Sequence, residues 1–122
     1  MELHESGEMY LESILVLKKR FGYVRSIDIA NEMNVSKPSV SRAVGLLKEN
    51  GYITFDPNGM ILLTDEGQQI AEKIYERHEV LTHILTSIGV SEETASHDAC
   101  KIEHVISDET FSVLKQKLSE IE

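Results

Sequence analysis

Residues 26–63, with the sequence SIDIANEMNVSKPSVSRAVGLLKENGYITFDPNGMILL, contain the pattern that decides the fold. Ser26 can cap a short helix over residues 27–33, because a serine oxygen accepts hydrogen bonds from the free N–H groups of a first helical turn. After an Asn-Val turn, Ser36 caps a second helix, and Pro38 is tolerated in its first turn, where no intrahelical bond is lost. This stretch therefore predicts two short helices joined by a tight turn.

Two short apolar stretches follow the second helix. Residues 52–55 and 60–63 flank the sequence Asp-Pro-Asn-Gly, and residues of this kind form turns between antiparallel strands. The two stretches predict a small hairpin, or wing. Helix, turn, helix and hairpin in this order are typical of a winged helix-turn-helix, which binds DNA.

The rest of the chain is predicted to be helical, because apolar residues recur there at spacings of three and four. The further predicted helices span residues 7–21, 64–88, 91–106 and 107–118. One face of the long helix is a seam made of Ala71, Ile74, His78, Leu81, Leu85 and Ile88. The fold class is therefore mostly α.

The charge of the chain is unevenly distributed. The formal net charge is −9 at pH 7, which argues against diffuse binding to nucleic acid. Residues 36–48 nevertheless contain three basic residues and no acidic one, so the remaining chain carries −12. The second helix of the DNA-binding segment, which we call the reader (residues 26–63), is therefore basic, and the rest of the chain, which we call the body, is acidic.

The composition also limits the cellular compartment and the class of protein to which the chain can belong. No apolar run is long enough to span a bilayer, and Glu2 and Glu5 leave no room for a signal peptide. Cys100 is the only cysteine, which rules out an intramolecular disulfide. We expect a soluble, cytoplasmic protein with no membrane partner, and 122 residues exclude a large enzyme with a separate cofactor domain.

The basic helix is predicted to read DNA. Its apolar stripe docks on the body, while its opposite face carries small hydroxyls and basic groups that can reach phosphates and base edges in the major groove. The expected DNA-binding residues are Arg25, Ser36, Lys37, Pro38, Ser39, Ser41, Arg42 and Lys48. Arg42 has the planar fork suited to guanine or phosphate. The alternative is a solvated helix face in a winged helix that contacts another protein.

A second group of side chains predicts a metal site. His97, Cys100, Glu103 and His104 share one face of the predicted helix 91–106, and imidazole, thiolate and carboxylate together can bind a divalent transition metal. One helix cannot complete the coordination shell. The natural candidates elsewhere are Met9, Glu12 and His78. Each of these residues also has a purely structural explanation. Met9 could fill a gap in the core, Glu12 could lie on a solvated face and His78 could be a hydrogen-bonded core histidine. Cys100 could be a small buried hydrophobic residue.

Several motifs together resemble one family. They are Glu8-Met9-Tyr10-Leu11, VSKPSVS at residues 35–41, Arg77-His78, and HDACKIEH at residues 97–104. These motifs are similar to those of the diphtheria toxin repressor and manganese transport regulator family, over essentially the whole chain. The resemblance implies a DNA-binding domain over residues 1–70, a helical metal-binding and dimerisation domain over residues 71–122, and no enzyme activity.

The resemblance also implies roles for residues and partners. It implies homodimers that bind a palindromic operator in double-stranded DNA when Fe(II) or Mn(II) is bound, and that repress metal-uptake genes. Met9, Cys100, Glu103 and His104 fall on the activating site of the iron-type members. Glu12 and His78 match positions that manganese-type members use for a second metal. Ser36, Pro38, Ser39 and Arg42 fall where the family contacts its operator.

Two departures from the family pattern are expected to matter. Thr82 stands where many members have a glutamate, and the chain ends before the SH3-like domain of the longer iron repressors. Both departures argue against a full iron-type ancillary site at His78 and His97, and a two-metal arrangement that uses Glu12 stays open.

The donor atoms bear on the choice of metal. The sulfur donors of Met9 and Cys100 favour Fe(II) over Mn(II), and Co(II), Ni(II) or Zn(II) are expected to bind as well. In the mechanism that we expect, the bound metal ties the first helix to the helix of Cys100 and fixes the spacing of two recognition helices in a dimer. Apolar residues of the last two helices, Ile102, Val105, Ile106, Phe111, Val113 and Leu114, are expected to form the dimer interface.

Two rival functions remain open at this stage. One is a metalloenzyme that uses Cys100, Glu103 and His104, for which the short helical body offers little material for a substrate pocket. We expect no small organic substrate. The other rival is a winged-helix regulator that senses oxidation of Cys100 instead of a metal.

Overall fold

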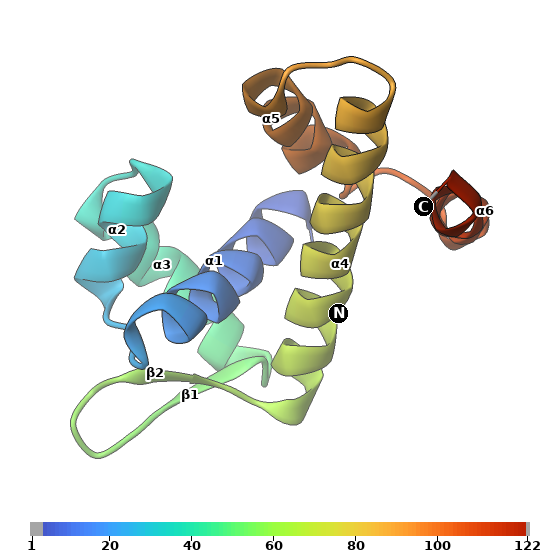
Figure 1. Ribbon diagram of the computed structural model, residues 1–122. Coiled ribbons are helices and arrows are strands. Elements are labelled where there is room, and N and C mark those ends of the chain that lie inside the picture. The colour runs from blue at the N-terminus through green and yellow to red at the C-terminus, as the bar shows by residue number, and fades with distance from the viewer. Residues whose placement is uncertain (1–3, 122) are drawn as a thin grey trace. The chain divides into compact units, whose positions relative to one another are not determined.

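The computed structural model describes residues 4–121, which form two compact units that are divided between Glu72 and Lys73. The first unit contains α1 (Glu5–Phe21), α2 (Ser26–Met33), α3 (Lys37–Glu49), β1 (Ile53–Phe55), β2 (Ile61–Leu63) and the start of α4 (Asp65–Ser87). The second unit contains the rest of α4, α5 (Glu92–Ile102) and α6 (Asp108–Ile121). The prediction of a mostly helical chain with a winged helix-turn-helix is confirmed (Figure 1).

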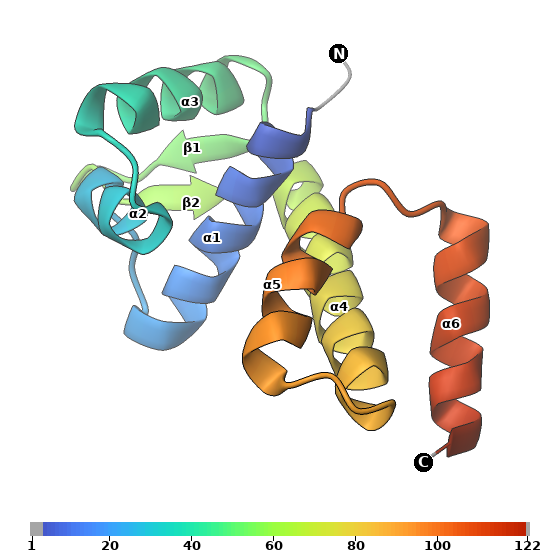
Figure 2. The ribbon, with the colours of Figure 1, turned by 90° about the horizontal axis from the view of Figure 1, so that it is seen from above.

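The first unit is built around a hairpin. β1 and β2 are antiparallel, and Ile53 pairs with Leu63. β1 lies beside α3 and β2 beside α1, so that the hairpin joins the two helices (Figure 2). The core of the unit consists of Leu11, Ile14, Leu17, Val24, Ile29, Val40, Ile53 and Ile61, which are all buried. Burial of these aliphatic side chains is what holds the reader together.

The turn between α2 and α3 forms as the sequence predicts. Asn34 adopts the left-handed conformation, with φ of 55°, and ends α2. Ser36 then caps α3 by accepting a hydrogen bond from the Ser39 N–H at 3.2 Å, and Pro38 lies in the first turn. The prediction that Ser26 caps α2 is wrong. Arg25 occupies the cap position, because its own N–H donates to the Asp28 carboxylate at 2.9 Å.

The junction between the wing and α4 is tightly packed. The Thr64 hydroxyl donates to the Gly51 carbonyl at 2.7 Å, and the Thr64 N–H donates to the Tyr52 carbonyl at 3.1 Å. A Cβ added to Gly67 would lie only 2.0 Å from that Tyr52 oxygen. The first turn of α4 therefore fits against the wing only because residue 67 has no side chain.

In the second unit, α5 and α6 lie on opposite sides of α4 (Figures 1 and 2). The seam of α4 is buried at Ala71, Ile74 and Leu81. The prediction that the seam continues to Ile88 is wrong, because α4 ends at Ser87 and Ile88 is 70% exposed. Within residues 4–121, no helix has the length and apolar character that a bilayer crossing requires.

The end of α5 also differs from the prediction. The helix was expected to continue to about residue 106, but it ends at Ile102, and Glu103 and His104 lie in the turn that follows. Arg77 of α4 explains this turn. The Nη1 atom of this buried arginine donates to the carbonyl oxygens of Glu103, at 3.2 Å, and of Ile106, at 2.7 Å. Since these bonds require both carbonyls to face Arg77, the chain leaves the helix there.

Arg77 also holds the start of α6. Its Nη2 atom donates to the Asp108 carboxylate, and its guanidinium carbon lies 5.5 Å from the centre of the Phe111 ring. A hydrogen bond from Lys73, together with the charge of Arg77, lowers the pKa of Asp108 below its ordinary value. One side chain of α4 thus ties the turn after α5 to the first turn of α6.

Candidate metal centre and nucleic-acid interface

The exposed face of α3 carries the predicted DNA-reading residues. Val40, Val44 and Leu47 are buried and fix the helix to the body. The opposite face exposes Ser36, Lys37, Pro38, Ser39, Ser41, Arg42 and Lys48. The first turn of α3 contains no acidic residue, so nothing there opposes an approaching phosphate. The geometry of α3 is that of a recognition helix.

Three of the predicted DNA-binding residues on α3 already make contacts within the unit. The Ser36 hydroxyl donates to the Ser39 oxygen at 2.9 Å, and the Lys48 ammonium lies 5.3 Å from the centre of the Phe55 ring in the wing. Arg42 is exposed on the same face of α3. The recognition helix and the wing therefore present their polar groups in a partly ordered state, which lowers the entropy lost on binding.

Arg25 lies at the start of α2 and not on α3. Its Nε and Nη2 atoms both bind the Asp28 carboxylate, each at 3.1 Å, and its guanidinium carbon lies 5.4 Å from the centre of the exposed Tyr23 ring. The hydrogen bond from Arg25 lowers the pKa of Asp28, and Asp28 in turn raises the pKa of Arg25. An arginine in this arrangement is held in one orientation at the surface of the reader.

The centre of the candidate metal site is Glu103. Its side chain is completely buried, and it lies between two imidazoles of the same unit. The Nδ1 atom of His78 is 2.9 Å from Oε2 of Glu103, and the Nε2 atom of His104 is 3.3 Å from Oε1. A buried carboxylate is costly unless positive charge or hydrogen bonds compensate it, and here both of its oxygens face imidazole nitrogens.

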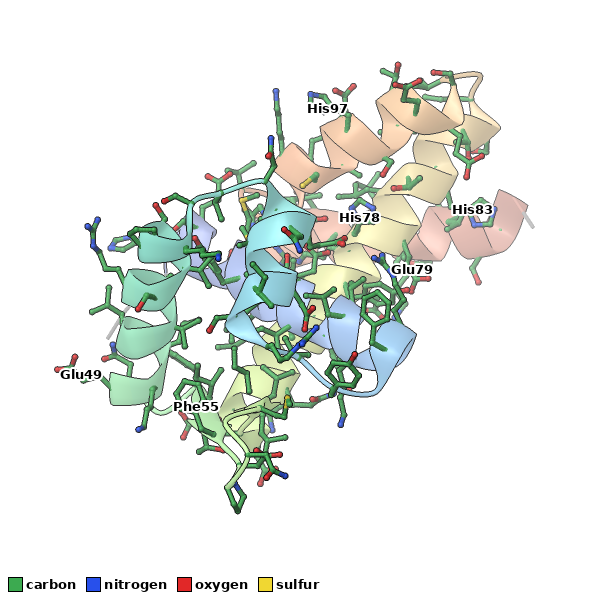
Figure 3. The ribbon with its side chains drawn as sticks, turned by 90° about the vertical axis from the view of Figure 1, so that its left-hand side faces the viewer. Glu49, Phe55, His78, Glu79, His83 and His97 are labelled. Carbon is green, nitrogen blue, oxygen red and sulfur yellow. The ribbon has the colours of Figure 1, made fainter. Side chains whose placement is uncertain are left out.

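The remaining predicted ligands have different surroundings. Cys100 is half-buried on α5, one turn before His104. His97 is exposed on α5, and its side chain lies apart from that of His78 (Figure 3). Met9 and Glu12 are half-buried on α1 in the first unit. The structure thus brings together three of the seven predicted ligands within the second unit.

Two residues near this cluster were missed by the sequence analysis. Arg77 holds the backbone of Glu103, and Ser96 places its hydroxyl oxygen 3.3 Å from Nε2 of His78. The spacing does contain a signal for Ser96, because residues 96, 100 and 103 follow the i, i+4, i+7 rhythm of one helix face. Arg77 belongs to the Arg77-His78 motif, but no sequence rule predicts its contacts with the carbonyl oxygens of Glu103 and Ile106 and with the Asp108 carboxylate.

The donor set fits a divalent transition metal. Two imidazoles and one carboxylate that already converge are ligands of the kind that Mn(II), Fe(II) and Zn(II) take in proteins. A cation would take the place of the proton that His78 Nδ1 and Glu103 Oε2 share at 2.9 Å. The fit rests on this chemistry and on the complete burial of Glu103.

The comparisons with known proteins cover both units. Residues 2–60 match the family described as "Iron dependent repressor, N-terminal DNA binding domain". Residues 64–122 match "Iron dependent repressor, metal binding and dimerisation domain". The chain therefore belongs to the iron-dependent repressor family of metal-dependent transcriptional repressors, as the resemblance implies. Members of this family are transcriptional regulators and not enzymes, so the metalloenzyme alternative is set aside.

Individual relatives agree with this placement. An uncharacterised HTH-type transcriptional regulator of Methanocaldococcus jannaschii is 34% identical over 115 residues, which are 93% of this chain and 92% of the relative. The HTH-type transcriptional regulator MntR of Geobacillus thermodenitrificans is 37% identical over 102 residues, 84% of this chain and 72% of the relative. The solved structure of the manganese regulator SloR has a TM-score of 0.83 and 28% identity, and the match covers 98% of this chain and 55% of that chain.

Proposed function

We propose that this chain is a homodimeric, Fe(II)-activated repressor that binds a palindromic operator and controls metal-uptake genes. The buried carboxylate of Glu103 between two imidazoles carries the proposal, because such a group is suited to a cation of this class. Since its partner is chromosomal DNA, we place the protein in the cytoplasm. Neither a membrane nor a small organic substrate enters the proposal.

The proposed ligands are the cluster described above together with residues from both ends of the chain. His78, Glu103 and His104 form the core of the site, and Cys100 supplies a thiolate. Met9 and Glu12 are included because the family resemblance assigns ligand roles to these positions. When bound, the cation would hold these groups together and neutralise part of the acidic charge of the chain, which favours approach to DNA.

The preference for Fe(II) rests on sulfur. A thioether at Met9 and a thiolate at Cys100 are softer donors than the carboxylates that manganese sites favour. Mn(II) is the second candidate, because MntR of Geobacillus thermodenitrificans and the manganese regulator SloR are among the relatives. Co(II), Ni(II) and Zn(II) are expected to bind in vitro, since affinity rises along this series.

The proposed dimer places two copies of α3 on one face of DNA. A two-fold dimer matches successive major grooves when its recognition helices are about 34 Å apart, and this symmetry makes the operator palindromic. Val105 and Val113, which are 75% and 51% exposed, are apolar side chains that a partner subunit would cover. They belong to the set of residues 102–114 that the sequence assigns to the interface.

Metal dependence is tested by an anaerobic gel-shift selection on genomic fragments, with chelator, Fe(II) or Mn(II) added to the wild type and to Cys100→Ala. We expect specific binding that requires metal, and a preference for Fe(II) that is lost in Cys100→Ala. Equal preference of both proteins for Mn(II) would favour the manganese candidate. Binding that persists under chelator and is abolished by peroxide would favour the thiol-redox alternative.

The role of α3 is tested with Arg42→Ala. Loss of an arginine contact to a base or phosphate is expected to weaken operator binding by about 1–3 kcal/mol. The matched control is Arg20→Ala, because Arg20 is an exposed arginine of α1 that pairs with Glu32 at 2.9 Å. Fluorescence anisotropy with a labelled operator measures both variants. Equal affinities for the two variants and the wild type would exclude Arg42 from the interface.

A further inference from the structure

We propose that Ser96 is a positioning residue for the metal site, whose hydroxyl holds the His78 ring in place whichever of its two nitrogens carries the proton. The inference deepens the proposed function, because it rests on His78 as a metal ligand. It concerns only residues of the second unit. Ser96 was not among the residues that the sequence assigned to the site.

The His78 ring is held at both of its nitrogens. Its Nδ1 atom lies 2.9 Å from Oε2 of Glu103, and its Nε2 atom lies 3.3 Å from Oγ of Ser96. The ring thus bridges α4, the turn after α5 and α5 itself. A ring with partners on opposite edges cannot rotate without losing both of them.

The chemistry of the two partners differs. An ionised carboxylate only accepts hydrogen bonds, so beside Glu103 a neutral His78 carries its proton on Nδ1. The bare Nε2 atom then accepts a hydrogen bond from the hydroxyl of Ser96. A serine hydroxyl both donates and accepts, which neither a carboxylate nor an ammonium group does.

This dual character matters when His78 offers Nδ1 to a cation. If Nδ1 held a cation, its proton would pass to the solvent and the neutral ring would carry a proton on Nε2, taken from the solvent, so that the number of protons on the ring would not change. Nε2–H would then donate to the Ser96 oxygen, and the contact would persist with its direction reversed. A partner to the other nitrogen that fixes ring orientation is what metal-binding histidines usually require.

An open hollow beside the His78 ring makes this exchange accessible. A cavity of about 670 Å³ lies between α4 and α5, and its lining includes His78, Glu79, Thr82, Glu92 and Ser96. The His78 side chain is 26% exposed, whereas Glu103 on its other edge is completely buried. Protons can therefore reach the Nε2 edge of the ring from solvent while the carboxylate edge stays dry.

The test compares Ser96→Ala, which removes the hydroxyl, with Ser96→Thr, which keeps it. Ser87→Ala is the matched control, because the Ser87 hydroxyl bonds the Ile84 carbonyl at 2.7 Å at the end of α4 and does not contact His78. Nitrogen-15 NMR of the histidine rings reports which nitrogen carries the proton, first in metal-free protein and then with Zn(II), which is diamagnetic. Calorimetry measures the affinity for Mn(II), and thermal melts verify that each variant folds.

In the wild type we expect a protonated Nδ1 without metal and a protonated Nε2 with Zn(II). Ser96→Ala is expected to leave the proton on Nδ1 in the metal-free protein, because Glu103 sets the tautomer, but to shift the Nε2 resonance of His78, which loses its hydrogen bond. Its affinity for Mn(II) is expected to fall about tenfold, at the lower end of the usual effect because water can enter from the hollow. Ser96→Thr and Ser87→Ala should stay within about twofold of the wild type. An unchanged Nε2 resonance of His78 and an unchanged Mn(II) affinity in Ser96→Ala would overturn the inference.

Failure of the proposed function gives a different pattern. If His78→Ala binds Mn(II) as tightly as the wild type, then His78 is not a ligand and the proposed site is wrong. The metal-free spectra of Ser96→Ala would still report on the contact between Ser96 and His78. A failure of the inference about Ser96 and a failure of the proposed metal site are therefore distinguished by separate experiments.

Discussion

Glu103→Gln is expected to abolish metal-dependent binding to the operator. The glutamine side chain has nearly the same shape, but it lacks the negative charge and presents an NH₂ group where one carboxylate oxygen now faces an imidazole. The affinity for Mn(II) or Fe(II) should fall by more than about 100-fold, beyond the range seen when only an outer partner of a ligand is lost. Anaerobic calorimetry and gel shifts measure the two effects.

The matched control for this variant is Glu93→Gln. Glu93 lies in the first turn of α5 and is exposed, so its substitution changes the net charge equally without touching the cluster. It should retain the metal affinity of the wild type. If Glu103→Gln and Glu93→Gln behave alike, the buried carboxylate has only a structural role and the proposed metal site would have to be abandoned.

Gly67→Ala is expected to destabilise the first unit. The added Cβ would lie 2.0 Å from the Tyr52 carbonyl oxygen, which also accepts the Thr64 N–H, so that the wing or the start of α4 must move. Overpacking of this kind costs about 1–3 kcal/mol, occasionally more, and it outweighs the gain of up to about 1 kcal/mol that alanine brings to a helix. Urea denaturation measures the free energy of unfolding.

Gly45→Ala is the matched control for this substitution. Gly45 lies in α3, and a Cβ built there meets nothing within 4 Å. Alanine at residue 45 is therefore expected to stabilise the chain by up to about 1 kcal/mol, since only the helix propensity changes. A stabilising effect at both glycines would contradict the close approach of α4 to the wing.

The winged helix-turn-helix could be predicted because its determinants are local. Ser36 caps α3 and Asn34 ends α2 through contacts within a few residues, and the sequence pattern contains both. The cap of α2 was misplaced by one residue. The sequence rule favours a hydroxyl and so selects Ser26, whereas at the observed cap the main-chain N–H of Arg25 donates to the carboxylate of Asp28, three residues later.

The metal cluster could be predicted only in part. The chemistry of histidine, cysteine and glutamate at helical spacing identified Glu103 and His104, but helical periodicity placed them inside a helix. They lie in a turn because Arg77, 26 residues earlier, takes the carbonyl of Glu103. Contacts over such separations leave no periodic trace in a sequence. The contact of Ser96 with His78, 18 residues earlier, was not anticipated either, although Ser96 lies at helical spacing from Cys100 and Glu103.

The contrast between the basic α3 and the acidic remainder has a consequence for how such a regulator finds its operator. A chromosome offers an enormous excess of ordinary DNA, and a uniformly basic protein would spend its time there. With −12 outside residues 36–48, the chain is repelled from duplexes that α3 does not fit. Because binding to nonspecific DNA is weak, most of the regulator stays unbound. The rate at which genes respond to a change in metal supply then depends on recognition of the operator and not on release from nonspecific DNA.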